Sequence, residues 1–264
     1  MPEGDTIVRT AATLRPALAG KPLVRFEAPR LHFSPFPAGT TVRGVESRGK
    51  HLLIGFDDGR VLHTHLQMSG SWHVYRPHDR WRRPPHQLRA LIEVPDAVAV
   101  CFNAPTVELL RERDLARHAV LASLGPDLCA PDVDLEEVLA RLGRLPPETE
   151  VGVALLDQRV ACGVGNVYKS ETLFAVRVDP FAPLSALDGP SRRAVYRTAS
   201  DLLRRNLAGG RRVTAPGGVA VYRRAGRPCP RCGTRIRSRR QGESARATYW
   251  CPSCQASPVP AASR

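Results

Sequence analysis

The 264-residue chain has no apolar run long enough to cross a bilayer, which takes about 18 residues, and its start lacks the basic-then-apolar pattern of a secretion signal. We therefore expect a protein without a membrane partner, located in the cytoplasm. No internal repeat is visible. Apolar residues make up 42% and charged residues 24%, so global disorder is not expected and the chain can bury a real core.

Lysine is scarce throughout, and acidic residues are scarce in one segment. The only lysines are Lys21, Lys50 and Lys169, so arginine supplies nearly all the positive charge. Residues 191–250 hold 16 arginines against two acidic residues, and the net charge of +14 lies entirely in this segment. Such a concentrated charge indicates a polyanionic partner. Because arginine supplies nearly all the positive charge of the chain, arginine content alone does not locate a recognition site.

Seven cysteines occur, and the last four form two Cys-x-x-Cys pairs. These four are Cys229, Cys232, Cys251 and Cys254. Two such pairs, with an intervening hairpin to bring them together, fit a four-thiolate zinc site. Two disulfides or a redox pair are the alternatives, which a cytoplasmic location disfavours. The remaining cysteines have apolar neighbours and are expected in the core: Cys101, Cys129 and Cys162.

The hydrophobic pattern changes from strand-like to helical near residue 114. Asp5 can cap a first helix that runs to about Leu18. Short strand-like runs separated by Gly and Pro turns follow at 22–27, 40–46, 51–57, 60–65, 71–75, 88–94 and 97–103. Helical spacing then occurs at 134–142, 149–160, 167–176 and 191–207. The order indicates an α+β protein of several domains: an antiparallel β-sandwich or barrel, a helical domain and a zinc hairpin.

A series of motifs then carries a resemblance to a known family. They are Met1-Pro2-Glu3-Gly4, Ser47-Arg48-Gly49-Lys50-His51, His65-Leu66-Gln67-Met68-Ser69-Gly70, Gly125-Pro126-Asp127-Leu128, Leu156-Asp157-Gln158, Gly163-Val164-Gly165-Asn166, Glu171-Thr172-Leu173-Phe174 and the zinc pairs. In this order they resemble the formamidopyrimidine-DNA glycosylase / endonuclease VIII family of bacterial base-excision repair enzymes, in an actinobacterial type.

The resemblance implies a domain order and a set of partners. It implies a catalytic antiparallel β-sandwich with flanking helices over 1–113, a helix–two-turn–helix DNA-binding domain over 114–224, a zinc-finger β-hairpin over 225–256 and a loose tail over 257–264. Damaged DNA is the implied partner, and one structural Zn²⁺ the implied cofactor. We expect a monomer that acts in the nucleoid.

The implied activity is that of a bifunctional DNA glycosylase and AP lyase. With Met1 removed, Pro2 would present a secondary amine that attacks the sugar C1′ and forms an iminium ion, which makes β- and δ-elimination feasible. Glu3 would donate a proton to the opening deoxyribose ring. Lys50 resembles a lysine that contacts phosphate and assists base departure, and Arg246 an arginine that grips phosphates. Incidental roles stay open: a proline after the initiator, a solvated lysine and one more arginine in a basic segment.

Three further residues match family positions that contact DNA or base. Asn166 is expected to cap the helix that starts at Val167 and to bind phosphate together with the helix N-terminus. His65 resembles a phosphate contact, and a buried strand histidine is the alternative. Glu171 resembles a pocket carboxylate of the endonuclease VIII branch, and an exposed helix glutamate is the alternative.

A wedge loop is expected at Gln67, Met68 and Ser69. An enzyme that works at C1′ of a duplex nucleotide must flip the nucleotide out and fill the gap. Met68 is an apolar, adaptable side chain suited to that role. A core methionine is the alternative.

Three departures from the oxidised-purine relatives favour the endonuclease VIII branch, which acts on oxidised pyrimidines. The chain begins MPEGDT rather than MPEGPE, residues 103–108 replace an Arg-x-Phe wedge pair, and the loop after Gly209-Gly210 is short. Ser123 and Ser69 depart from endonuclease VIII relatives, which leaves duplex grip and opposite-base preference open.

Two competing hypotheses remain at this point. One keeps the enzyme class but moves the substrate to formamidopyrimidine or 8-oxoguanine. The other is a non-catalytic zinc protein that binds damaged DNA through its basic segment. The arginine-rich stretch 76–83 either touches DNA or is a solvated loop.

Overall fold

The computed structural model describes residues 2–256, which divide after Ser123 into two compact units. The loose tail expected over 257–264 lies outside the described residues. The zinc hairpin belongs to the second unit together with the helical segment. Among the described residues, no helix is both long and apolar enough to span a membrane.

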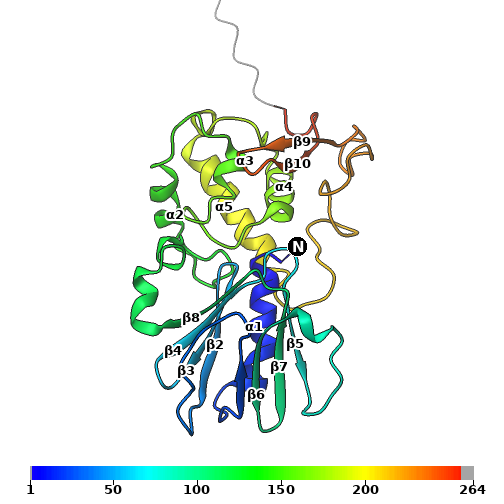
Figure 1. The fold of residues 1–264 in the computed structure, drawn as a ribbon. Helices are drawn as coiled ribbons and strands as arrows, with labels where there is room; N and C mark the ends of the chain where they lie inside the picture. Colours follow the sequence, from blue (N-terminus) through cyan, green and yellow to red (C-terminus); the bar gives the residue numbers. More distant parts are fainter. Residues whose placement is uncertain (1, 257–264) are drawn as a thin grey trace, which may run out of the picture. The chain divides into compact units, whose positions relative to one another are not determined.

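The first unit is a sandwich of two antiparallel four-stranded sheets with one long helix, α1 (Gly4–Leu18) (Figure 1). The sheets have strand orders β1-β6-β7-β5 and β2-β3-β4-β8. The strands are β1 (Arg25–Glu27), β2 (Val42–Arg48), β3 (His51–Phe56), β4 (Arg60–His65), β5 (Ser71–Tyr75), β6 (Leu88–Val94), β7 (Ala97–Phe102) and β8 (Thr106–Arg111). The expected N-terminal antiparallel β-sandwich is confirmed.

The core of this unit is shared by both sheets and α1. Ile7, Ala11, Leu14 and Leu18 recur at helical spacing and pack against buried strand residues such as Ile54. The expected cap at Asp5 is wrong, because the helix already begins at Gly4, with Glu3 at the N-cap position. The Asp5 carboxylate instead lies in the first turn and accepts the Thr6 N–H at 2.7 Å.

Strand β8 is the element that the sequence pattern does not predict. Its residues are half-exposed and show no clean alternation. It forms because it pairs with β4 along its full length, from Arg60 with Arg111 to His65 with Thr106. Short 3-10 turns complete the unit: Pro85–Gln87, Glu112–Arg117 and Leu121–Ser123.

The second unit joins four α-helices to a two-stranded hairpin (Figure 1). Its elements are α2 (Leu135–Leu142), α3 (Val151–Ala154), α4 (Asn166–Ala175), a 3-10 turn (Leu184–Ala186), α5 (Gly189–Arg204), β9 (Arg237–Gln241) and β10 (Arg246–Trp250). Asp134 caps α2 and Asp188 caps α5, each by accepting a backbone N–H three residues on. α4 packs against α5 and β10.

Two expectations about the helices are corrected. The helix expected over 149–160 is only the single turn α3, since Asp157 turns back to accept the Arg159 N–H at 2.9 Å, a local bond that competes with helix. Asn166 does not cap the helix that follows, because Gly165 holds the N-cap position and Asn166 is the first helical residue.

Candidate nucleic-acid site

The start of the chain places two predicted catalytic residues at the N-terminus of α1. Pro2 is half-buried and Glu3 is fully buried. The Glu3 carbonyl accepts the N–H groups of Thr6 and Ile7 and so closes the first helical turn. Because α1 is anchored in the sandwich core along its whole length, Pro2 and Glu3 project from a fixed helix end.

Lys50 occupies the tight turn between β2 and β3. Arg48 pairs with His51, which leaves Gly49 and Lys50 as the two loop residues. Gly49 has a φ of 57°, the left-handed value that a two-residue hairpin of type II′ needs at its first position. The short loop therefore fixes the direction in which the Lys50 stem leaves the sheet.

His65 lies beside this turn at the end of β4. His65 pairs with His51 across the ladder, and the two rings stack with centroids 4.5 Å apart. Burial and the nearby positive charge of Lys50 lower the pKa of His65 to about 4. At neutral pH His65 is therefore an uncharged imidazole, which can meet a phosphate oxygen by donating a hydrogen bond but not as a cation.

The predicted wedge loop, residues 67–69, is held against the turn after β7. Gln67 has a φ of 46°, and the Ser69 hydroxyl donates to the Asn103 carbonyl at 3.0 Å. A Cβ on Gly70 would lie 2.7 Å from the Leu66 carbonyl oxygen, so only glycine fits there. Met68 is 66% exposed at the tip of the loop. A core role for Met68 is excluded, and its role as a plug stays a prediction.

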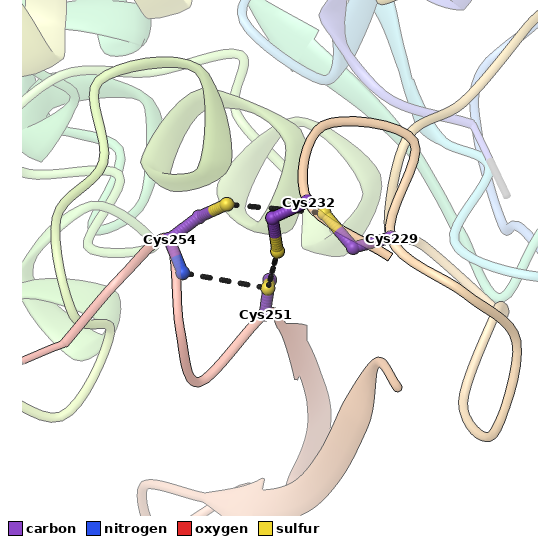
Figure 2. A group of neighbouring side chains, drawn as sticks. All are labelled: Cys229, Cys232, Cys251 and Cys254. Atoms are coloured by element: carbon purple, nitrogen blue, oxygen red, sulfur yellow. Dashed lines mark hydrogen bonds between the residues drawn. The ribbon is translucent and has the colours of Figure 1, made fainter. Parts of the chain in front are cut away.

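The four cysteines of the hairpin bring their sulfurs together in one cluster, seen in Figure 2. The sulfurs of Cys232 and Cys251 are 3.5 Å apart and those of Cys229 and Cys254 are 3.9 Å apart. These distances are far beyond a disulfide bond of about 2.05 Å. They match the edge of about 3.8 Å of a tetrahedron with Zn–S bonds of about 2.3 Å. The donor set therefore fits a zinc ion.

Arg246 is the first residue of β10, and the next two residues of this strand contact side chains of α4. The Ala247 carbonyl accepts a hydrogen bond from the Asn166 amide at 2.7 Å. The Thr248 hydroxyl contacts the Lys169 ammonium at 2.5 Å, and Gln241, the ladder partner of Arg246, lies 3.4 Å from the same ammonium. These contacts fix the strand that carries Arg246, while Arg246 itself is exposed.

Models of known protein families match three successive stretches of the chain. Residues 1–106 match the formamidopyrimidine-DNA glycosylase N-terminal domain, residues 124–216 its H2TH domain, and residues 226–256 a zinc finger found in FPG and IleRS. The chain belongs to the formamidopyrimidine-DNA glycosylase family.

The chain is similar along nearly its full length to proteins named as an endonuclease 8 and as an AP lyase. It is 43% identical to "Probable endonuclease 8 2" of Streptomyces coelicolor, over 98% of this chain and 96% of that protein. It is 40% identical to "DNA-(apurinic or apyrimidinic site) lyase Nei2" of Mycolicibacterium smegmatis, over 97% of this chain and 99% of that protein. Its fold is similar to that of Lactococcus lactis Fpg in complex with N7-benzyl-Fapy-dG DNA, with TM-score 0.80, 22% identity, and coverage of 97% and 100%.

The zinc prediction is confirmed by the family model and the geometry together. The hairpin holds one structural zinc on Cys229, Cys232, Cys251 and Cys254. Backbone N–H groups point at two of the sulfurs, from Arg231 to Cys229 and from Cys254 to Cys251, each at 3.4 Å. As expected, the other cysteines are buried core residues.

Glu171 is buried in α4 and holds a loop of the second unit. Its carboxylate accepts the backbone N–H groups of Ala220, Val221 and Tyr222 at 2.7–2.8 Å and the Thr214 hydroxyl. The alternative of an exposed helix glutamate is therefore excluded. A place in the substrate pocket stays a prediction, and these contacts mean that Glu171 would act there through the loop it holds.

Asn166 lies at the start of α4 in the second unit. Asn166 is 6% exposed and one hydrogen of its amide is taken by the hairpin, so its phosphate contact stays a prediction. In the first unit, Arg80 and Arg82 line an open groove of about 660 Å³ together with α1 and β5. The stretch is ordered by the Tyr75 hydroxyl, which accepts the Arg82 N–H, and by Trp81, which packs edge-on against Phe102.

Sequence reasoning missed a buried lysine and a partly buried cluster of polar side chains that support the predicted residues. Lys169 is fully buried beneath the hairpin, although a helix lysine is normally solvated. The other group is formed by His51, His63, Glu108 and His118 in the first unit. The only signal in the sequence was the recurrence of histidine at 51, 63 and 65, which becomes meaningful once β3 and β4 are known to pair.

Proposed function

We propose that this chain excises oxidised bases from damaged DNA, pyrimidines above all, and then cleaves the abasic strand with the amine of Pro2 as nucleophile. The observation that carries the proposal is the combination of Pro2 and Glu3 at the end of a core-anchored helix with full-length similarity to an endonuclease 8 and an AP lyase.

The first step belongs to Pro2 and Glu3. After removal of Met1 the amine of Pro2 attacks C1′ of the flipped nucleotide, the bond from C1′ to the base breaks, and the base leaves with the electron pair and a proton. The positive end of α1 disfavours a charged amine and so favours its nucleophilic form. Glu3 supplies a proton to the ring oxygen as the sugar opens, which leaves an iminium ion between Pro2 and C1′.

The second step removes the phosphates. The iminium acidifies the C2′ hydrogen, so loss of that proton expels the 3′ phosphate, and a second elimination expels the 5′ phosphate. Lys50 and Arg246 are proposed to neutralise the departing phosphates, which is a task suited to a turn lysine and to the planar guanidinium of arginine. Met68 would fill the gap in the duplex, supported by its exposure at the tip of a fixed loop.

A monomer in the nucleoid is sufficient for this activity. The proposed nucleophile, proton donor, phosphate contacts and wedge all come from one chain, so no second copy is needed to complete the site. The preference for pyrimidines is supported by the endonuclease 8 relatives and by the absence of the Arg-x-Phe pair at residues 103–108.

Borohydride trapping tests the proposal. Processed protein mixed with abasic or thymine-glycol duplex DNA and borohydride should give a covalent adduct, which disappears in Pro2→Gly while Met68→Ala retains it at a lower rate. Trapping that persists in Pro2→Gly would exclude Pro2 as the nucleophile. A panel of thymine glycol, formamidopyrimidine and 8-oxoguanine duplexes then tests the substrate, and faster nicking of the purine lesions would reverse the pyrimidine preference.

A further inference from the structure

Four side chains of the first unit form a continuous chain of hydrogen bonds. His51 Nδ1 lies 2.9 Å from His63 Nε2, and His63 Nδ1 lies 2.7 Å from Glu108 Oε2. His118 Nε2 reaches the same carboxylate oxygen at 3.1 Å. The hydrogen bonds thus link β3, β4, β8 and His118, the residue that follows the turn Glu112–Arg117. The reaction proposed above uses none of these side chains.

The direction of this chain is fixed at its far end. The Leu121 backbone N–H donates to His118 Nδ1 at 3.2 Å, so that nitrogen carries no hydrogen and His118 Nε2 must be the donor toward Glu108. An ionised carboxylate only accepts, so His63 Nδ1 is also a donor. A neutral His63 then accepts at Nε2, and His51 donates from Nδ1.

A metal ion is the other arrangement that such a cluster suggests. The ligand atoms of His63, Glu108 and His118 all lie within 4.8 Å of one another. A metal on His118 Nε2, however, would require a hydrogen on Nδ1, where it would face the Leu121 N–H. The backbone therefore favours hydrogen bonds over a metal at this place.

The series of hydrogen bonds ends at His51, beside two residues of the proposed site. His51 follows Lys50 directly and stacks on His65. The charged and titratable groups that face these two rings are Lys50, His63, His118 and, through His63, Glu108. Burial, with help from the neighbouring histidines and Lys50, lowers the pKa of His51 to about 3, so all its bonds are those of a neutral ring. A charged ring in this position would repel the Lys50 ammonium.

We propose that Glu108, acting through His63, is a positioning residue for Lys50 and His65. Its carboxylate fixes the tautomer of His63, His63 fixes the tautomer and the plane of His51, and the His51 ring supports both the Lys50 turn and the face of His65. This inference rests on the proposed function, because Lys50 and His65 act on DNA only there.

Tautomers can be measured without DNA and so test the chain of hydrogen bonds independently of activity. Two-bond ¹H–¹⁵N correlation spectra of the zinc-loaded full chain labelled in histidine should show His51 and His63 protonated at Nδ1, and His118 at Nε2, at neutral pH. Glu108→Ala should change the His63 and His51 signals, whereas Glu112→Ala, which removes an exposed partner of Arg43, should change neither. A His63 protonated at Nε2, or signals of His63 and His118 that move when zinc beyond one equivalent is added, would overturn the proposal.

Single-turnover cleavage of abasic DNA tests the positioning role. Glu108→Ala should lower the rate roughly tenfold, in line with the loss of a hydrogen-bond partner of the buried His63. Glu108→Gln should restore most of the rate, since both histidines donate to one oxygen, which an amide also offers. The loss should be smaller in a Lys50→Ala background than in the wild-type protein, because part of the effect of Glu108 passes through Lys50 and the rest through His65. His63→Phe repeats the comparison should Glu108→Ala fold poorly.

The outcomes separate this inference from the proposed function. No cleavage or trapping by the wild-type protein would contradict the proposed function, while the tautomer spectra would still decide the hydrogen-bond chain. Normal cleavage by wild type together with an undiminished rate in Glu108→Ala, or losses that simply add in the double variant, would reject the positioning role alone.

Discussion

Each unit carries one cationic side chain that we propose to contact the DNA phosphates. The surroundings that hold this side chain in place differ between the two units. Lys50 stands on a two-residue turn beside uncharged imidazoles, in the part of the chain that carries no net charge. Arg246 stands on a hairpin held by four zinc-binding cysteines and a buried ammonium, within the segment that carries all the net charge. The uncharged rings beside Lys50 add no positive charge that would repel it, whereas a densely basic hairpin needs strong internal links to stay folded against its own repulsion.

Removal of zinc should have the largest effect, and only on the second unit. The binding energy of a structural zinc is in large part the folding energy of its hairpin, so Cys251→Ser should release the metal and slow strand cleavage by roughly a hundredfold. Zinc content, strand cleavage and unfolding of the full chain measure this. Cys129→Ala, which removes a buried thiol outside the cluster, should keep one zinc per chain. Equal cleavage with and without zinc would show that the hairpin does not hold Arg246 in place.

The buried lysine should come next. Lys169→Met leaves Thr248 and Gln241 without their charged partner, and we expect a loss of about 1–3 kcal/mol in the free energy of unfolding of the second unit. Lys21→Met is the matched control, since Lys21 forms an ion pair with the largely exposed Asp96, worth about 0–1 kcal/mol. Denaturant unfolding of both variants measures the difference. Equal losses would mean that burial adds nothing to the Lys169 contacts.

The first unit should instead be sensitive to acid. The pKa values of His51 and His65 lie near 3 and 4 in the folded protein, below the ordinary value of about 6.5 in an unfolded chain. The unfolded state therefore binds protons first as the pH falls, so this contribution to stability is complete above about pH 6.5 and is lost progressively as the pH falls to about 3. Hydrogen exchange of β3 and β4 amides across this range should show it. His65→Gln should flatten the dependence and an exposed His78→Gln should not; no change in either would contradict the assignment.

The sequence predicted the parts of this molecule that rest on repeating patterns. The strands of the first unit other than β8 follow short strand-like runs separated by turn residues, and the zinc site follows from the spacing of four cysteines alone. Strand β8 was missed because pairing with β4, rather than its own pattern, makes it a strand. Glu108 could not be singled out for the same reason, since its contact with His63 exists only because β4 and β8 pair.

Helix positions were harder to interpret than strands where a side chain reaches another element. Asn166 lies one residue inside the helix it was expected to cap, because its amide is used by the hairpin carbonyl of Ala247. Lys169 and Glu171 follow on the same helix, and each is buried by a partner far along the chain. No local rule predicts a buried charge of this kind, since its cost is offset only by long-range contacts.

The salt dependence of DNA binding should show the smallest effect and the finest distinction between the two units. Each phosphate neutralised by a cation releases counterions and adds about −0.9 to the slope of log affinity against log salt. Arg246→Ala and Lys50→Ala should each reduce the magnitude of that slope by about 0.9. His65→Gln should weaken binding at every salt concentration and leave the slope unchanged, because the His65 ring is neutral at the assay pH. Fluorescence anisotropy measures all three with a duplex that carries a tetrahydrofuran analogue of the abasic site, which cannot form the iminium and is not cleaved; Arg43→Ala is a control whose guanidinium is paired with Glu112. A reduced slope for His65→Gln would mean that DNA recruits a proton to this ring, and the contrast between a neutral and a charged support would then be lost.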